Sequence, residues 1–200
     1  MKLTKRPYRL GRRGEAAGET RRRIVAATSD LHAEQGIAAT TMRQIAARAG
    51  VSVGTVYHHF PSYADAIAAC GAYTTEHVPA PTDAIFAGVP SRHERIERLA
   101  SAAFDYYARL PVLGSVRRDQ AIAATLRKFV KQEVVHRRRL AALAVGADAQ
   151  DRRSALVAAL VDFDVYQALL RQGFDRSAAA ATVAALANAW LDGNDRPTDA

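Results

Sequence analysis

Apolar and polar residues near the start of the chain are spaced as in an amphipathic helix. After Thr20, which can cap a helix, apolar side chains recur at positions that include Ile24 and Leu31, and Gly36 ends the pattern. Recurrence every three or four residues places these side chains on one helical face. The pattern therefore predicts a first helix over about residues 20–35.

Two shorter helices follow, and capping residues mark where each begins. Thr41 has Gln44 three residues later, which is the spacing of a capping box, and the helix that they begin ends at Gly50. Ser52 then caps a third helix that runs to about Phe60. Two short helices joined by about four residues that include a glycine are the components of a helix-turn-helix.

The rest of the chain favours long helices and has no segment with the alternation of a strand. Prolines and glycines between residues 79 and 88 mark a connecting loop. We expect helices at 63–77, 91–109, 115–145, 149–171 and 175–191. The predicted fold is all-α, with an N-terminal three-helix helix-turn-helix domain, a C-terminal helical bundle and about nine helices in total.

The composition excludes several classes of protein. Cys70 is the only cysteine among the 200 residues, which excludes an intramolecular disulfide, a thiolate metal cage and a paired-thiol redox site. No segment approaches the roughly 18 apolar residues of a membrane-spanning helix, and the N-terminus lacks the apolar core of a secretion signal. We therefore expect a cytoplasmic protein that does not enter the membrane.

Positive charge is concentrated in the N-terminal part of the chain. Residues 1–60 hold 11 Lys and Arg against 4 Asp and Glu, a net charge of +7, whereas the remainder carries only +1. Such asymmetry is typical of a segment that binds a polyanion, although a solvated basic tail has the same composition. The basic residues at or before the first helix are Lys2, Lys5, Arg6, Arg9, Arg12, Arg13, Arg21, Arg22 and Arg23. They can follow a DNA backbone or enter a minor groove, as flexible arms do.

One continuous motif links these elements to a known family. The segment from Gly36 to Ser62 reads GIAATTMRQIAARAGVSVGTVYHHFPS. With its paired threonines, its Ala-Gly-Val-Ser turn and its Gly-Thr-x-Tyr-x-x-Phe run, it resembles the DNA-binding domain of TetR-family transcriptional regulators. The resemblance extends back to Thr20 and weakens in the second half of the chain. Three features depart from the pattern. His32 stands where the family often has Phe, and the run from Tyr63 to Asp65 lacks the usual acidic pair. Tyr63 stands where Lys commonly follows Pro-Ser, so one phosphate contact is either a phenol hydroxyl or missing.

The resemblance implies three parts. We expect a basic flexible arm at 1–17, a helix-turn-helix domain at 18–62, and a ligand-binding and dimerisation domain at 63–200. Members of the family usually dimerise through their last two long helices and bind a small molecule between their central helices. The resemblance thus implies a homodimer paired through 149–171 and 176–191, a palindromic operator in double-stranded DNA and an unidentified small-molecule effector.

Ten residues are candidates for contact with DNA. Hydroxyls and free amides at capped helix starts suit phosphate oxygens. The candidate phosphate contacts are Thr41, Ser52, Thr55, Tyr57 and Tyr63. The guanidinium of Arg43 can reach guanine O6 and N7, and Val53 with Gly54 offers a small apolar surface to a thymine methyl. His58 and His59 can donate to bases or phosphates. Val53 can instead cover the turn, and His59 can instead pack inside the domain.

Candidate effector-binding side chains lie in the central helices of the second half. They are Phe104, Tyr107, Leu110, Phe129, Phe163 and Tyr166, with Arg117 and Asp162 as polar anchors. Core packing explains the same stripes without a ligand. It also explains the two apolar stripes of 149–171, although two stripes equally suit a helix that packs on a partner subunit. We interpret the run from His136 to Arg139 as a solvated helical face.

The leading hypothesis is a homodimeric repressor that a small-molecule effector releases from its operator. A DNA-binding regulator without an effector, such as an activator or an architectural protein, is the alternative. An enzyme is not expected, because no nucleophile motif, phosphate loop or metal cluster accompanies acid–base groups such as His93, Asp105 and Tyr106. No metal or other cofactor is expected, and His58 and His59 point about 100° apart on a helix, which argues against a shared metal.

Overall fold

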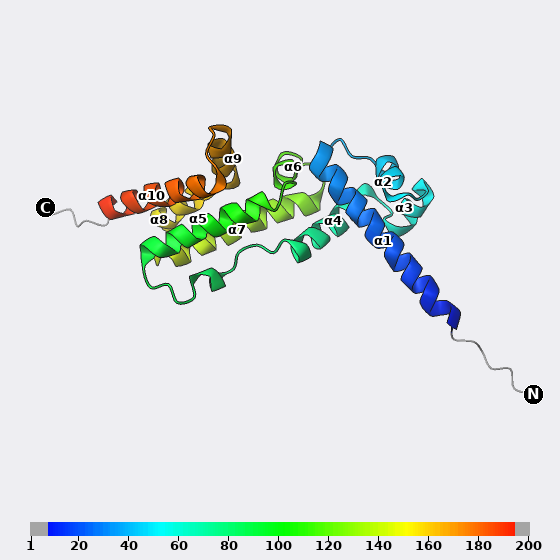
Figure 1. Cartoon of the computed structure of the whole chain (residues 1–200), viewed down its shortest axis with the longest axis horizontal. Coiled ribbons are helices and arrows are strands. Elements are labelled where there is room, and N and C mark those ends of the chain that lie inside the picture. Colours follow the sequence, from blue (N-terminus) through cyan, green and yellow to red (C-terminus); the bar gives the residue numbers. More distant parts are fainter. Residues whose placement is uncertain (1–7, 195–200) are drawn as a thin grey trace, which may run out of the picture. The chain divides into compact units, whose positions relative to one another are not determined.

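The computed structural model describes residues 8–194 and the side chains of residues 14–194. These residues form ten α-helices and one 3₁₀ helix and contain no strand (Figure 1). In chain order the elements are α1 (Tyr8–Gln35), α2 (Met42–Ala49), α3 (Val53–His59), α4 (Tyr63–His77), η1 (Asp83–Phe86), α5 (Arg92–Ala108), α6 (Leu113–Arg118), α7 (Ala124–Val145), α8 (Arg152–Leu160), α9 (Phe163–Arg171) and α10 (Arg176–Asn194). The predicted all-α fold is confirmed.

The helices gather into two compact units. The first unit comprises the chain up to His77 together with Gly114–Arg127, and the second comprises Val78–Leu113 and the rest of the chain. Helix α4 packs against α1 and buries Ala66 in the apolar core of the first unit. The first unit therefore extends beyond the boundary predicted at residue 62, and it also takes in a segment from the middle of the chain.

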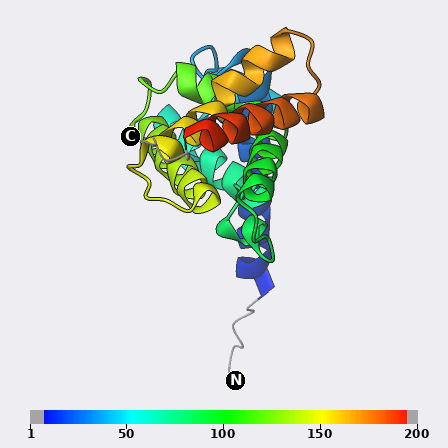
Figure 2. The same ribbon diagram turned by 90° about the vertical axis from the view of Figure 1, so that its left-hand side faces the viewer.

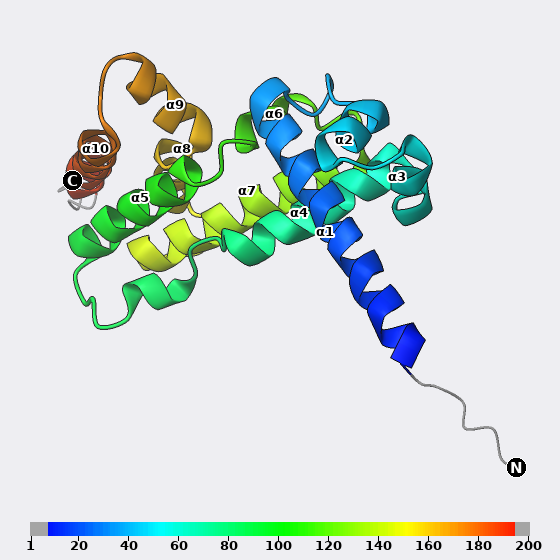
Figure 3. The same ribbon diagram turned by 45° about the vertical axis from the view of Figure 1, so that its right-hand side comes forward.

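The first unit is built around α1, against which α2 and α4 pack (Figure 3). Ile24 and Leu31 of α1, Ile45 of α2 and Val56 of α3 are almost completely buried in one apolar cluster. Removing each such side chain from water contributes about 1.5–3 kcal/mol to stability. The predicted helical spacing therefore placed the core of this unit correctly.

Helix α1 begins earlier than the sequence predicts. It starts at Tyr8, and the hydroxyl of Thr20 donates to the carbonyl of Ala16, 2.9 Å away, inside the helix. Thr20 is therefore not a cap, because a threonine can satisfy its hydroxyl on the preceding turn of a helix that continues through it. The predicted flexible arm at 1–17 is helical from Tyr8 on, and its first seven residues lie outside the described part of the chain.

Two helices that the sequence predicts as continuous are each interrupted at an aspartate. The predicted 115–145 helix leaves helical geometry after Arg118, where the Asp119 carboxylate accepts from the backbone N–H of Ala38 at 2.9 Å. The predicted 149–171 helix is interrupted where Asp162 caps α9. Aspartate side chains favour such breaks because they bind backbone N–H groups that a straight helix does not present to them.

The second unit is a helical bundle in which α5 packs antiparallel to α10. In Figure 2, α10 is the helix coloured from orange to red. Ion pairs join the ends of the two helices, from Arg92 to Asp192 at 2.6 Å and from Arg176 to Asp105 at 2.8 Å. The bundle core includes the buried side chains of Ile96, Leu99, Phe104, Val157, Val161, Val183 and Leu191.

The two residues that depart from the family pattern contact each other in the first unit. His32 is only 2% exposed, and its Nε2 lies 2.9 Å from the hydroxyl of Tyr63. That hydroxyl donates to the carbonyl of Ile37 at 2.6 Å, so it accepts from His32, and the neutral imidazole carries its proton on Nε2. Burial lowers the pKa of His32 to about 4, against an opposing effect of the Asp119 carboxylate.

We expect His32 to make the protein less stable in acid. An unfolded chain protonates this imidazole below about pH 6.5, whereas the native state resists protonation until about pH 4. The free energy of unfolding should therefore fall as the pH drops through this window, by about 3 kcal/mol from this group. Urea unfolding at several pH values should show a smaller fall for His32→Phe, whereas His58→Gln, an exposed control, should retain the wild-type pH dependence. Parallel curves for wild type and His32→Phe would contradict the assignment.

Candidate nucleic-acid interface

Helix α2 begins at the predicted capping box. The hydroxyl of Thr41 accepts from the backbone N–H of Gln44 at 3.3 Å, and the Gln44 side chain accepts from the backbone N–H of Thr41 at 2.8 Å. The helix ends at Gly50, whose φ of 65° is left-handed, and the next amide, of Val51, donates back to Ala46 at 3.0 Å. The turn of the helix-turn-helix is thus set by local sequence.

Helix α3 has one buried and one exposed side. Ser52 caps its start by accepting from the backbone N–H of Thr55 at 3.0 Å, as predicted. Val56 is fully buried, whereas Val53 is 37% and Tyr57 is 49% exposed. Large apolar and aromatic side chains held in water on a short helix suit contact with a partner surface.

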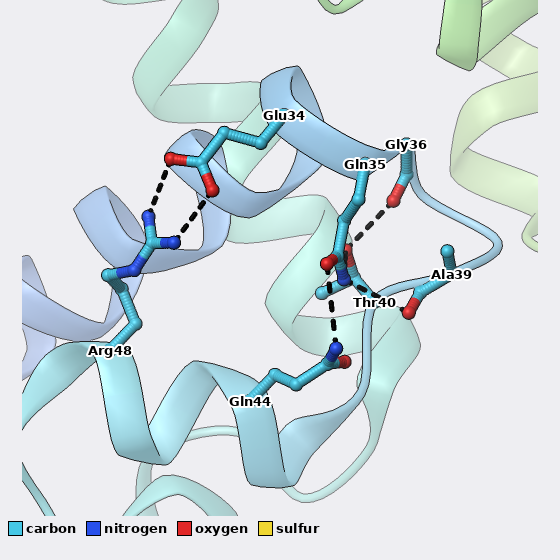
Figure 4. Close-up of polar contacts among 7 residues, drawn as sticks. All are labelled: Glu34, Gln35, Gly36, Ala39, Thr40, Gln44 and Arg48. Carbon is cyan, nitrogen blue, oxygen red and sulfur yellow. Dashed lines mark hydrogen bonds and ion pairs between the residues drawn. The ribbon is translucent and has the colours of Figure 1, made fainter.

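Side chains of α1 fix the position of α2 (Figure 4). Arg48 donates to both carboxylate oxygens of Glu34, at 2.8 and 2.7 Å. This paired contact lowers the pKa of Glu34. Gln35, next to Glu34 in α1, donates to the carbonyl of Ala39 at 3.0 Å and accepts from Gln44 of α2 at 3.5 Å. A two-bond arginine–carboxylate contact defines an orientation as well as a distance.

Arg23 has a role that the sequence analysis missed. Its guanidinium donates to the carbonyls of Ala49 and Gly50, at the C-terminal end of α2. Helix ends leave carbonyls unpaired and carry partial negative charge, so a cation is favourable there. The donor lies 26 residues before its acceptor in the chain, and no local motif signals such a contact.

Arg21 and Arg22, which precede Arg23 in the sequence, make different contacts from it. Arg21 lies over the ring of Phe60, 5.1 Å from the ring centre, and Arg22 pairs with Glu19 on the exposed surface of α1. Treating the three arginines as one DNA-binding arm is therefore wrong for Arg23, because protein carbonyls already bind its side chain.

Nine of the ten candidate DNA contacts lie on α2, on α3 or at their capping positions, and none of the nine is buried. They are Thr41, Arg43, Ser52, Val53, Gly54, Thr55, Tyr57, His58 and His59. The rings of the two histidines touch edge to face, with centres 5.4 Å apart. Tyr63 is the exception and requires a correction. Its hydroxyl donates to the carbonyl of Ile37 and accepts from His32, so it has no free O–H to offer a phosphate. The hydroxyl of Thr41 is likewise committed, because it donates to the Gln44 side chain at 2.8 Å.

Most of the candidate effector residues pack against one another in the second unit. Phe104 and Tyr166 have ring centres 4.9 Å apart, and Tyr107 meets Phe163 edge to face at 5.5 Å. Leu110 is buried in the same core, against which Phe129 is partly buried. Contacts of this kind are those of a packed core. Arg117 differs, because it lies on the part of α6 that belongs to the first unit.

The proposed polar anchor Asp162 belongs to a buried charged cluster. Arg137, with 13% of its side chain exposed, pairs with Glu133 and, at 2.7 Å, with Asp162. Tyr107 donates to the carbonyl of Val161 at 3.1 Å, and burial followed by the charge of Glu133 raises its pKa. The interpretation of 136–139 as a solvated face is therefore wrong for Arg137, which serves the interior of the bundle.

The two apolar stripes of 149–171 meet different environments. Val157 and Val161 are fully buried in the core of their own unit, whereas Leu156, Leu160 and Leu170 are only partly buried. On α10 the most exposed large apolar residue is Leu186, at 56%. Val165 of the first stripe is also only partly buried, and Phe163 of the second is buried, so packing within the chain explains each stripe in part.

A groove that the sequence did not predict runs between α5 and α10. Its volume is about 380 Å³. The side formed by α5 consists of Glu97, Ser101 and Asp105, and that formed by α10 consists of Arg176, Ser177, Ala180, Ala181, Ala184 and Ala185. Alanine and serine side chains make up most of its lining, together with three charged residues.

The part of the chain that the structure describes contains neither a membrane-spanning helix nor a cluster of metal ligands. Across residues 8–194, no helix combines the length and the apolar character needed to cross a bilayer. Among the described side chains, no three His, Cys, Asp or Glu residues gather in an arrangement suited to a metal ion.

Comparison with known proteins finds similarity in the N-terminal helices. Residues 24–70 match the family model described as bacterial regulatory proteins, tetR family. Over 78 residues the chain is 38% identical to the HTH-type transcriptional repressor KstR of Mycolicibacterium smegmatis, a match that covers 38% of each protein. The chain thus matches well under half of the length of this curated relative.

Solved structures extend the similarity of fold over most of the chain. A transcriptional regulator from Rhodococcus sp. Rha1 (RHA1_ro04179) is 21% identical, with a TM-score of 0.65 over 86% of this chain and 96% of its own. A regulator from Saccharomonospora viridis in complex with choline is 19% identical, with a TM-score of 0.58 over 88% of this chain and 97% of its own. Both likenesses support the all-helical fold over most of the chain.

The contact of Arg23 with the end of α2 should contribute measurably to stability. We expect Arg23→Ala to lower the free energy of unfolding by about 1–3 kcal/mol, because two helix-end carbonyls lose a charged donor. Arg22→Ala, next in sequence, should change it by less than about 1 kcal/mol, because its pair with Glu19 is exposed. Urea unfolding followed by circular dichroism measures both. Equal effects of the two substitutions would contradict the role given to Arg23.

Proposed function

We propose that this chain, a TetR-family transcriptional regulator, is a homodimeric cytoplasmic repressor that binds a near-palindromic operator and is released from it by a small-molecule effector. The sidedness of α3 carries the DNA-binding part of the proposal. With Val56 buried against the domain core, the exposed residues of α3 form the surface offered to a major groove.

The exposed groups of this surface suit a duplex. The hydroxyls of Ser52 and Thr55 share a hydrogen bond of 2.8 Å at the start of α3, and a phosphate oxygen can accept from the hydroxyl that does not donate in this pair. Tyr57, His58 and Arg43 add donors that reach phosphates or base edges. The net charge of +7 over residues 1–60 favours association with DNA of any sequence, and base contacts then supply specificity.

A homodimer would present two such surfaces to successive turns of DNA. The partly buried leucines of α8 and α9 and the exposed Leu186 of α10 are the apolar groups that a second copy would cover. The proposed interface therefore uses α8, α9 and α10. A twofold arrangement places the two reading helices about 34 Å apart, which requires an operator with matching symmetry.

Two features of the second unit support an effector. The groove between α5 and α10, at about 380 Å³, has the size of a small-molecule site. The regulator of similar fold from S. viridis binds choline. An effector that prefers the arrangement unable to bind DNA by about 1–3 kcal/mol would lower operator affinity roughly 5- to 150-fold.

The packing of the aromatic residues favours one alternative. Phe104, Tyr107, Phe163 and Tyr166 touch one another in the core of the second unit, so the cluster expected to bind an effector is already filled by its own rings. A DNA-binding regulator without an effector has this property. The two hypotheses differ in whether any compound lowers operator affinity.

Selection of duplexes from a random-sequence pool tests the DNA-binding proposal. We expect the wild-type chain to enrich a near-palindromic sequence. Arg43→Ala should then cost about 1–3 kcal/mol in operator affinity and relax the preference at one position of each half-site. Lys131→Ala, an exposed substitution on α7, should retain the wild-type sequence preference. Equal weakening of Arg43→Ala on every duplex would assign Arg43 to phosphate, and failure of the wild type to enrich any sequence would contradict the proposal.

Sedimentation equilibrium tests the dimer. The wild type should sediment as a dimer, and Leu186→Glu should raise the dissociation constant by a factor of about 30 or more, because pairing would bury an unpaired carboxylate. Val135→Glu is the matched control, since Val135 is 62% exposed on α7, outside the proposed interface. A monomeric wild type, or a dimer that tolerates Leu186→Glu and dissociates with Val135→Glu, would contradict this interface.

A further inference from the structure

The turn between α1 and α2 is held by side chains from three parts of the chain. Within the turn, the Thr40 hydroxyl donates to the carbonyl of Gly36 at 2.8 Å. From α4, Tyr63 donates to the carbonyl of Ile37 at 2.6 Å. From the segment after α6, a carboxylate oxygen of Asp119 accepts from the backbone N–H of Ala38 at 2.9 Å. Backbone groups of three successive residues of this turn are therefore bound by side chains.

The contact made by Asp119 is partly buried and closely packed. Asp119 is only 8% exposed, and its other carboxylate oxygen lies 3.4 Å from Nε of Arg118. Gly36, with a φ of 88°, lies so close to this segment that a Cβ atom there would be 3.2 Å from the Arg118 guanidinium and 3.4 Å from the Ser115 hydroxyl. A buried carboxylate that accepts from a backbone N–H orients the backbone that it binds.

The chain path makes this contact different from an ordinary helix cap. Asp119 lies in Gly114–Arg127, which packs with the first unit, whereas the chain on both sides of this segment belongs to the second unit. Helix α7, Ala124–Val145, continues without interruption from one unit into the other. Asp119 is therefore joined through the covalent chain to the second unit on both sides.

We infer that Asp119 is a positioning residue for DNA binding, which acts through the backbone N–H of Ala38. Three residues after Ala38, Thr41 begins the capping box of α2, so the bound turn sets where α2 begins and, through the next turn, where α3 lies. Loss of the acceptor leaves the Ala38 N–H without its partner and loosens the entry to the reading helices. The inference rests on the proposed DNA-binding function and adds to it a positioning residue from a segment far along the chain.

Two variants and one control test this role, with duplex DNA selected by the wild-type chain as the probe. Asp119→Ala should bind this duplex about tenfold more weakly, and its Ala38 amide should exchange hydrogen at least about tenfold faster. Asp119→Asn keeps an oxygen acceptor and should stay within about twofold of the wild type in both measurements. Arg118→Ala removes the other contact of the carboxylate and should also stay close to the wild type. Should Asp119→Ala fail to fold by circular dichroism, Asp119→Leu, of similar shape, replaces it.

The outcomes separate this inference from the proposed function. Enrichment of a sequence by the wild type, together with equal affinity for Asp119→Ala, would overturn the role of Asp119 while the DNA-binding proposal stands. Equal losses for Asp119→Asn and Asp119→Ala would overturn the role of the hydrogen bond to Ala38. A wild type that selects no duplex would overturn the proposed function and, with it, this inference.

Discussion

The burial of Val56 determines which groups of the first unit are available to a partner. Helix α3 has seven residues, and Val56 is its one fully buried side chain, so this residue and the capped ends define the rotation of the helix about its axis. A rotation of about 100°, one residue of a helix, would exchange buried and exposed positions. The exposure of Val53 and Tyr57 is thus a consequence of the apolar cluster formed with Ile24 and Ile45. Function at this surface depends on packing behind it.

Charged groups with protein partners complete that packing. Arg48 and Glu34 hold α2 against α1, and Arg23 binds the carbonyls at the far end of α2. The N-terminal positive charge therefore has two roles, and the net charge alone does not show which residues have which role. Part of it stabilises the reading domain, and part remains available to a polyanion. In the second unit, the guanidinium of Arg137 likewise pairs with protein groups, the partly buried carboxylates of Glu133 and Asp162.

Features set by neighbouring residues were predictable from the sequence, whereas features set by distant contacts were not. The capping box at Thr41 and the cap at Ser52 involve residues three apart, and both are as predicted. The break at Asp119 depends on Ala38, 81 residues away in the sequence, and the spacing of apolar residues along the chain gives no sign of it. The contact of His32 with Tyr63 is of the same kind, since two unusual residues gave separate signals and only the fold shows that they belong together. The placement of nine candidate DNA contacts followed from local patterns, and the tenth failed because its partner lay 31 residues earlier.

The path of the chain through the two units has a consequence for the evolution of such proteins. Gly36 and Ala38 complete their surroundings with residues from Gly114–Arg127, so a reading domain cut after His77 would lack part of its own structure. Recombination that joins the N-terminal helices to a foreign sensory module would have to carry a compatible central segment with it. The N-terminal helices and Gly114–Arg127 would therefore have to be inherited together, although the 36 residues of Val78–Leu113 separate them in the sequence. A chimera joined in the loop after α4 would combine the turn between α1 and α2 with a central segment that does not match it.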